Sequence, residues 1–292
     1  MSTLELSEMD SVDAVGRGVL RRFLARPPAV VALAVLGVFV LLAVIQPFAL
    51  ASPTRIDTRH KFGAPGLAHP FGTDELGRDL LSRVAQAGQA SLGFAAGATA
   101  IAMVLGVAWG LLAAARPGWL DEVLMRVAEA ALAIPTLLFA LVFVAAFGSG
   151  ILAMTIVAGL LMAPLTARIT RSAVLAELKS EYVRGLTAVG ASRSRILFAE
   201  VLPNALPALL AQASLNVATS LMLEATLSFV GLGIQPPDAS WGTLLKAGYD
   251  RLYESVWYPV APALLIIAAI AALNTVGDQV QRVLRGTAWS GR

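Results

Sequence analysis

Long apolar runs alternate with short polar segments along the chain. Six of these runs come close to the roughly 20 residues that a helix needs to cross a bilayer. They cover residues 29–50, 92–115, 127–147, 151–167, 206–230 and 257–276. The third and fourth runs are separated only by Gly148-Ser149-Gly150, which predicts a tight helical hairpin. The pattern therefore predicts an all-α integral membrane protein with six transmembrane helices.

Composition supports a membrane protein, because 57% of the 292 residues are hydrophobic and only 14% are charged. A soluble domain has about 25% charged residues. The first apolar run has 22 residues, whereas the apolar region of a cleaved signal peptide has about 7–15. We therefore expect this run to remain as the first span.

The distribution of Lys and Arg predicts the orientation. If the N-terminus is inside, fifteen of the 22 basic residues lie in inner segments and seven in outer ones. This bias favours both termini in the cytoplasm. The expected units are a cytoplasmic segment 1–28, a first transmembrane helix 29–50, an extracytoplasmic loop 51–91 with an amphipathic helix, a core 92–276 with five spans, and a cytoplasmic tail 277–292.

The sequence lacks the residues and motifs that several kinds of chemistry require. It contains no cysteine, which excludes disulfides and thiolate sites. It has no G-x-x-x-x-G-K-[ST] loop, so we expect no nucleotide hydrolysis by this chain. His60 and His69 are the two histidines, too few for a metal or catalytic cluster. We therefore expect that this chain is not an enzyme and binds no metal or cofactor. We also expect no nucleic-acid partner, because the net charge of +3 reflects loop topology.

A polar row runs along the fifth span. Its members recur every four residues: Gln212, Asn216, Ser220, Glu224 and Ser228. Side chains four apart lie on neighbouring turns of one helix side. The row is either the wall of a translocation pathway or a set of hydrogen bonds that join helices. An acid within a span usually faces the bundle interior, so Glu224 suits packing or gating.

The outer loop carries the motif HPFGTDELGRDLLSRV at residues 69–84. The pattern predicts a turn with a helix N-cap at Thr73 or Asp74 and an amphipathic surface helix from Leu76. A structural lid that leads into the second span is the alternative. The extracytoplasmic residues of interest are Gly72, Thr73, Asp74, Gly77, Arg78 and Asp79.

Glycines and prolines mark two further features. The segment LSFVGLGIQPPDASWG, residues 227–242, stops the fifth span sharply. It either gates or docks an external partner, or it simply shapes the loop.

Glycine pairs in the second span let helix backbones approach closely, at a subunit interface or within the chain. These pairs are Gly93 with Gly97 and Gly106 with Gly110.

Residues 180–204, SEYVRGLTAVGASRSRILFAEVLPN, form a charged insert between the fourth and fifth spans. Tyr182, Leu186 and Val189 share one helical face. Gly190 permits a bend, and a second helix over 192–201 is expected to stop at Leu202-Pro203. Such an elbow suits docking into a groove of a cytoplasmic protein or lying on lipid.

Together, HPFGTDELGRDLLSRV, LSFVGLGIQPPDASWG and GASRSRILFAEVLPN (190–204) resemble hallmarks of one family. It comprises the C-type permease subunits of bacterial dipeptide, oligopeptide and nickel ABC importers. The resemblance covers about residues 20–285. It implies a type I ABC importer permease fold, multi-pass in the bacterial inner (plasma) membrane.

Within that family, the segment from Arg184 to Pro203 is similar to the E-A-A-x3-G-x9-I-x-L-P loop, which couples permeases to ATPases. Gly190, Leu202 and Pro203 match, whereas Arg184-Gly185-Leu186 replace Glu-Ala-Ala and Glu200 replaces Ile. The C-terminal tail departs from the family pattern and is assigned no role. The implied coupling residues are Glu181, Tyr182, Arg184, Gly185, Leu186, Gly190, Ala191, Arg193, Arg195, Leu202 and Pro203.

The resemblance implies a machine of several parts. They are this chain, a homologous B-type permease, cytoplasmic ATPase subunits that bind ATP and Mg, an extracytoplasmic substrate-binding protein and the surrounding lipid. The implied cargo is di- or oligopeptides, with nickel, a metal chelate or another small solute as the alternative. A stand-alone secondary transporter is the more distant alternative, and it would be expected to show inverted repeats.

Overall fold

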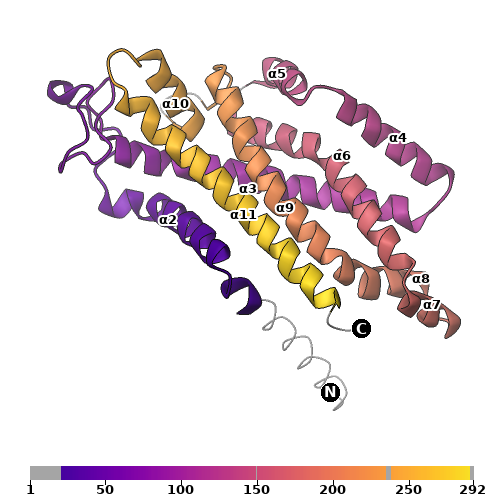
Figure 1. The fold of residues 1–292 in the computed structure, drawn as a ribbon. Coiled ribbons are helices and arrows are strands. Elements are labelled where there is room, and N and C mark those ends of the chain that lie inside the picture. Colours follow the sequence, from indigo (N-terminus) through magenta and orange to yellow (C-terminus); the bar gives the residue numbers. More distant parts are fainter. Residues whose placement is uncertain (1–20, 149, 235–237, 290–292) are drawn as a thin grey trace.

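The computed structural model describes residues 21–148, 150–234 and 238–289, and helices are the regular elements there (Figure 1). The helices are α2 (Pro27–Ala49), η1 (Thr58–His60), α3 (Leu80–Ala115), α4 (Trp119–Ala133), α5 (Thr136–Phe147), α6 (Ile151–Leu178), α7 (Glu181–Ala188), α8 (Arg193–Arg195), the π-helix η2 (Ile196–Val201), α9 (Leu202–Phe229), α10 (Trp241–Asp250) and α11 (Trp257–Trp289).

Five long apolar helices could each cross a membrane, and the bent pair α4–α5 could supply a sixth span. The predicted all-α membrane fold is therefore confirmed, with five spans, or six where the bent pair counts as one. Several helices are longer than the apolar runs that predicted them, since α3 begins at Leu80, α6 extends to Leu178 and α11 to Trp289.

The third span is not the straight helix predicted for 127–147. It begins earlier, at Trp119, and breaks into α4 and α5 with an angle of 84° between them. The break lies at Ile134, whose backbone is extended (φ −79°, ψ 125°), because a following proline disfavours helical geometry. Asp121 anchors α4 by accepting two bonds from the Arg171 guanidinium on α6, at 2.5 and 2.6 Å.

Helices α3 and α6 run side by side with little space between their backbones. A Cβ added to Gly106 would lie 2.5 Å from Cβ of Thr166, and one added to Gly110 would lie 2.6 Å from Cβ of Thr170. On Gly93 an added Cβ would meet nothing within 4 Å. The pair Gly106 and Gly110 therefore serves packing within the chain, one of the two readings of the pattern.

The inner end of the bundle is a compact junction. Leu111 of α3 and Val174 of α6 pack there with Val183 of α7, Ile196 and Val201 of η2. The start of α2 and the last turns of α11 lie at the same end in Figure 1, where Arg26 donates a hydrogen bond to Gln279 over 3.1 Å. This arrangement agrees with the orientation that the basic residues predict, with the 180–204 segment on the inner side.

At the outer end the predicted helix start is wrong. The N-cap of α3 is Asp79, which accepts from the Ser82 N–H at 2.8 Å, and neither Thr73 nor Asp74 caps a helix. Residues 75–76 form a turn, and Leu80 already belongs to α3, so the expected separate surface helix is the first part of that span. Asp74 is diverted from capping because it binds arginines instead.

Candidate functional site

Residues 180–204 form an elbow whose bend falls at Gly190, as predicted. The Ala191 N–H donates to the Leu186 carbonyl at 3.0 Å, and the Gly190 N–H donates to the Thr187 carbonyl at 3.1 Å. This pair of bonds is the Schellman motif, which requires a left-handed residue after the helix. Gly190 supplies it with φ +81°, in open space.

The helix that follows the bend does not end at Leu202-Pro203, so that prediction is wrong. α8, η2 and α9 form one continuous path from Arg193 to Phe229. The Leu202 N–H reaches five residues back to the Leu197 carbonyl. Such a π-type turn is often found at functional sites, and Pro203, which has no N–H to donate, lies directly after it.

The apolar face predicted for α7 is largely exposed, as a docking face would be, and a neighbouring residue packs inward. Val183 is buried and Leu186 is partly buried, whereas Tyr182 and Val189 are exposed. The Tyr182 hydroxyl donates to Glu177 at 3.1 Å and accepts from the Asn204 amide at 3.3 Å, which links α7 to the ends of α6 and α9. Partial burial raises the pKa of Tyr182, so the hydroxyl keeps its proton at neutral pH.

The outward surface of the elbow combines charge with apolar side chains. Arg184, Arg193 and Arg195 are exposed, and so are Val189 at 81% and Phe198 at 60%. Arg184 makes only a long contact of 3.6 Å with Glu181. Exposed apolar residues and exposed arginines within one short segment are typical of a surface that binds another protein.

The polar row of α9 is buried along its whole length. Gln212 donates to Asn216 at 2.8 Å, Asn216 donates to Thr166 of α6 at 3.0 Å, and Ser220 contacts the Met162 sulfur at 3.4 Å. These contacts favour the helix-joining reading for the middle of the row. A lining role in a translocation pathway stays a prediction.

Glu224 is the centre of a network that the sequence did not reveal. Its carboxylate accepts from Ser91 of α3 at 3.1 Å and from Ser228 at 2.6 Å. The Ser91 hydroxyl also accepts the Trp241 N–H at 3.0 Å, and Ser228 lies 3.3 Å from Ser240. The network therefore binds the N-terminus of α10 to α3 and α9. Only the shared polarity of these serines, far apart in sequence, hinted at their contact.

Cavities adjoin both ends of the row. Gln212 lines an inner cavity of about 490 Å³ beside Glu177, Asn204 and Gln281. Ser228 lines an outer cavity of about 600 Å³. Between these two ends of the row, Asn216, Ser220 and Glu224 are buried.

The extracytoplasmic motif is a tightly bonded turn. The Asp74 carboxylate accepts from Arg78 and from Arg83 of α3, each at 2.6 Å, and also from backbone N–H groups of the turn. Thr73 pairs with Asp79 across a single bridge. Gly72 and Gly77 have φ near +80° and +72°, and a Cβ on either would clash with the backbone of the 57–63 segment. These contacts favour the structural lid among the two readings of the motif.

The glycine-rich segment after α9 also has a structural explanation. Gly231, with φ +94°, ends α9 in a second Schellman turn, where the Leu232 N–H reaches the Leu227 carbonyl at 2.9 Å. Pro236 and Pro237 lie outside the described residues. Ser240 then begins α10 with a capping box to Thr243, so the segment shapes the outer loop around the Glu224 network.

Comparisons with known proteins agree with this architecture. Residues 106–287 match the family model of the binding-protein-dependent transport system inner membrane component. Residues 15–67 match the N-terminal TM domain of oligopeptide transport permease C.

Curated relatives cover most of the chain. The di/tripeptide transport system permease protein DppC of Pseudomonas aeruginosa (strain UCBPP-PA14) is 37% identical over 73% of this chain and 71% of its own length. An Escherichia coli (strain K12) protein named "Probable D,D-dipeptide transport system permease protein DdpC" is 32% identical over 88% of this chain and 87% of its own length.

Among solved structures, an inward-facing structure of the MetNI methionine ABC transporter contains a chain with the same fold. The TM-score is 0.56 at 21% identity, covering 67% of this chain and 93% of that one. The fold is thus that of a type I ABC importer permease. The chain belongs to the family of binding-protein-dependent transport system inner membrane components, and it is a multi-pass protein of the inner membrane.

Proposed function

We propose that this chain is the C-type permease subunit of an ATP-driven importer of di- or oligopeptides. It forms half of the translocation pathway together with a homologous B-type permease. Cytoplasmic ATPase subunits bind and hydrolyse ATP with Mg, and an extracytoplasmic binding protein delivers the peptide. This chain contributes no catalytic residue and holds no cofactor.

The observation that carries this proposal is the elbow at residues 180–204. It exposes arginines and apolar side chains on its outer surface, while its inner surface packs on the ends of α3 and α6. A push on α7 is therefore transmitted to two spans and, through η2, to α9. That is the geometry a lever needs to convert ATPase closure into movement of the bundle.

Peptide cargo is proposed from the relatives, because one is named a di/tripeptide permease and another a D,D-dipeptide permease. The same machinery could carry nickel, a metal chelate or another small solute. The residues of the described chain offer no group of three His, Asp or Glu side chains that could hold a metal ion. The selecting site is expected in the binding protein.

Reconstitution tests the proposal directly. The complex is purified through a tag on this chain and placed in vesicles with its binding protein outside. We expect uptake of a labelled dipeptide that needs both ATP and the binding protein. Uptake without ATP would instead support a stand-alone transporter. ATP-dependent uptake of a nickel chelate with no peptide uptake would leave the importer in place and change its cargo.

A further inference from the structure

The outer cavity that Ser228 lines is bordered by side chains of both charges. It lies between the outer loop, the start of α3, α10 and the first turn of α11, at the end of the bundle opposite α7 and α8 (Figure 1). Its charged lining residues are three basic and three acidic ones: Arg78, Arg83, Lys246, Glu75, Asp238 and Asp250. This balance suits a ligand that carries a positive and a negative group and no net charge.

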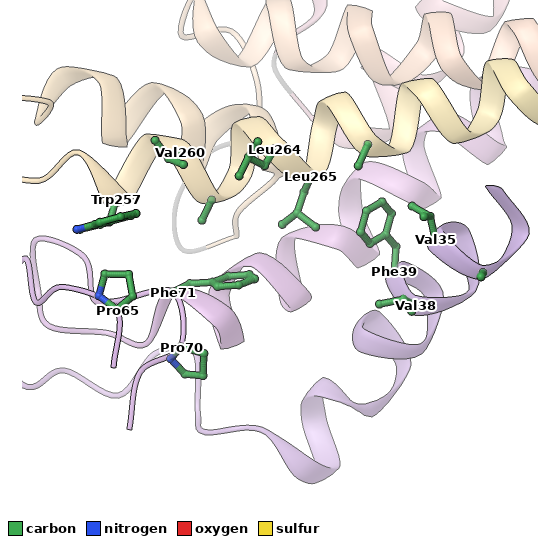
Figure 2. Close-up of a pocket in the computed structure, with 13 residues that line it drawn as sticks. Val35, Val38, Phe39, Pro65, Pro70, Phe71, Trp257, Val260, Leu264 and Leu265 are labelled. Atoms are coloured by element: carbon green, nitrogen blue, oxygen red, sulfur yellow. The ribbon is translucent and has the colours of Figure 1, made fainter. Parts of the chain in front are cut away.

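The apolar groove between α2 and α11 differs from this cavity (Figure 2). Its lining residues include Phe39, Phe71 and Leu265, and none of them is charged. Trp257 lines the groove, whereas the next residue, Tyr258, lines the outer cavity. The first turn of α11 thus borders both hollows, and of the two the outer cavity offers groups that can recognise a polar solute.

Helix α10 turns one face toward the outer cavity. Thr243, Lys246, Ala247 and Asp250 line it, with the spacing of three and four residues that places side chains on one side of a helix. On this face the Lys246 ammonium donates to both oxygens of Asp250, at 2.9 and 2.8 Å. The two side chains are 36% and 52% exposed. An ion pair this exposed contributes little stability, so a charged ligand can replace either partner.

The spacing of this ion pair matches the two ends of a dipeptide. Side chains four residues apart on a helix have Cβ atoms about 5–6 Å apart, and an extended dipeptide spans at most about 7 Å. A dipeptide that lies along α10 can therefore place its carboxylate at Lys246 and its ammonium at Asp250. Each side chain then exchanges one ionic partner for another.

Arg83 supplies further donors from α3. The residue is only 9% exposed, and its Nη1 donates to Asp74 and to the Tyr258 hydroxyl. A guanidinium carries five N–H groups in a planar fork, and no acceptor among the described residues bonds to Nε or Nη2 of Arg83. Because Arg83 lines the outer cavity, this remaining part of the fork is available to a carboxylate there.

We propose that the outer cavity binds the two charged termini of a dipeptide before it enters the membrane. Lys246 and Arg83 bind the terminal carboxylate, and Asp250 binds the terminal ammonium. Ser228 lines the same cavity and donates to Glu224 at 2.6 Å, which places the site at the outer end of the polar row. This inference rests on the proposed peptide cargo and adds a receiving site on this chain to the selection expected in the binding protein.

The first test measures protection of a thiol in the cavity. Because the chain has no cysteine, Ala247→Cys places a single thiol on the cavity face of α10. In reconstituted complex without the binding protein, a membrane-impermeant thiol reagent added outside should label this chain. We expect the dipeptide alanylalanine to slow that labelling at least fivefold. Tyr253→Cys is the matched control, because Tyr253 is fully exposed and does not line the cavity, and its labelling should not respond to the dipeptide.

Two results of this test would overturn the proposal. Labelling of Ala247→Cys at an unchanged rate with the dipeptide would show that none binds there. No labelling in the absence of the dipeptide would show that another subunit covers the cavity. Dipeptide uptake, measured with the binding protein and ATP, separates this site from the cargo. Uptake without protection would remove this site alone, whereas loss of both would also remove the peptide cargo.

A second test identifies the groups that are recognised. We expect the C-terminal amide and the N-acetylated form of alanylalanine to need at least tenfold higher concentrations for the same protection. Lys246→Gln should raise the protecting concentration of the free dipeptide several-fold and leave that of the amide unchanged. Arg251→Gln is the matched control, because Arg251 is exposed and does not line the cavity. Equal protection by all three compounds, or equal shifts in both variants, would overturn the proposal.

Discussion

The Ser91 hydroxyl of α3 donates a hydrogen bond to the Glu224 carboxylate of α9 over 3.1 Å, and it accepts the Trp241 N–H of α10 at 3.0 Å. One serine therefore joins three helices at the outer half of the bundle. Helix α10 also packs closely on α9, because a Cβ on Gly242 would lie 2.7 Å from Cβ of Ser228. Movement of α10 relative to α3 and α9 would break these contacts.

Glu224→Ala should weaken the contacts that join α3, α9 and α10. It leaves the Ser91 and Ser228 hydroxyls without their shared acceptor, at a cost of about 1–3 kcal/mol. We expect a lower thermal midpoint and altered transport in a complex that still assembles. Glu224→Gln should be milder, because the amide oxygen still accepts and a serine hydroxyl can accept from the amide nitrogen. Failure of both variants to assemble would make Glu224 purely structural.

The helix contact at Gly110 should be far less tolerant than the open position at Gly93. Gly110→Ala places a Cβ 2.6 Å from Cβ of Thr170, and overpacking of this kind costs about 1–3 kcal/mol. We expect a clear drop in the thermal midpoint of the complex. Gly93→Ala is the matched control and should leave the midpoint unchanged. Equal effects would show that Gly93 faces a contact outside this chain.

Asp74→Asn should destabilise the outer turn. The carboxylate is fully buried and binds both Arg78 and Arg83, and loss of one partner from a buried ion pair costs about 3 kcal/mol. A lower thermal midpoint and faster proteolysis of the 51–79 loop are expected. Lys246→Gln breaks the more exposed pair with Asp250 and should change the midpoint little, by less than about 1 kcal/mol. An Asp74→Asn variant as stable as this control would show that the Asp74 ion pairs with Arg78 and Arg83 do not stabilise the outer turn.

Hydropathy was enough to predict the spans, because a bilayer imposes the length and the apolarity of each helix. Helix ends were harder to predict. Polar residues such as Arg83 continue α3 beyond its apolar run, since Asp74 neutralises Arg83 across a turn. That pairing depends on the fold of the loop and not on local pattern.

The candidate sites were predictable to different degrees. Gly190 could be predicted as a bend from its position alone, but the buried face of α7 could not. An eight-residue helix has too few apolar positions to define one face, and contact with Leu111 and Val174 decides in favour of Val183. The row on α9 was visible from spacing, whereas its partner Ser91 lies 133 residues away from Glu224 and only the fold brings them together.

Charge reversal on the elbow should uncouple transport. Arg193→Glu combined with Arg195→Glu changes two exposed side chains, so the complex should still reach the membrane. We expect peptide uptake to fall while ATP hydrolysis continues. Unchanged uptake and unchanged stimulation of hydrolysis by the binding protein would remove these arginines from the ATPase contact.

Substitutions at the Gly190 bend test most directly whether residues 180–204 act as a lever. The measurement is the ratio of peptide taken up to ATP hydrolysed by the reconstituted complex. Gly190→Val forces a side chain into a left-handed backbone at about 1–2 kcal/mol, which is roughly 5- to 30-fold in an equilibrium constant. Gly190→Asn tolerates that geometry, and Gly185→Ala, in open helical space, is the control. We predict a ratio several-fold lower for Gly190→Val alone. A ratio equal in all three variants and the wild type would contradict the account.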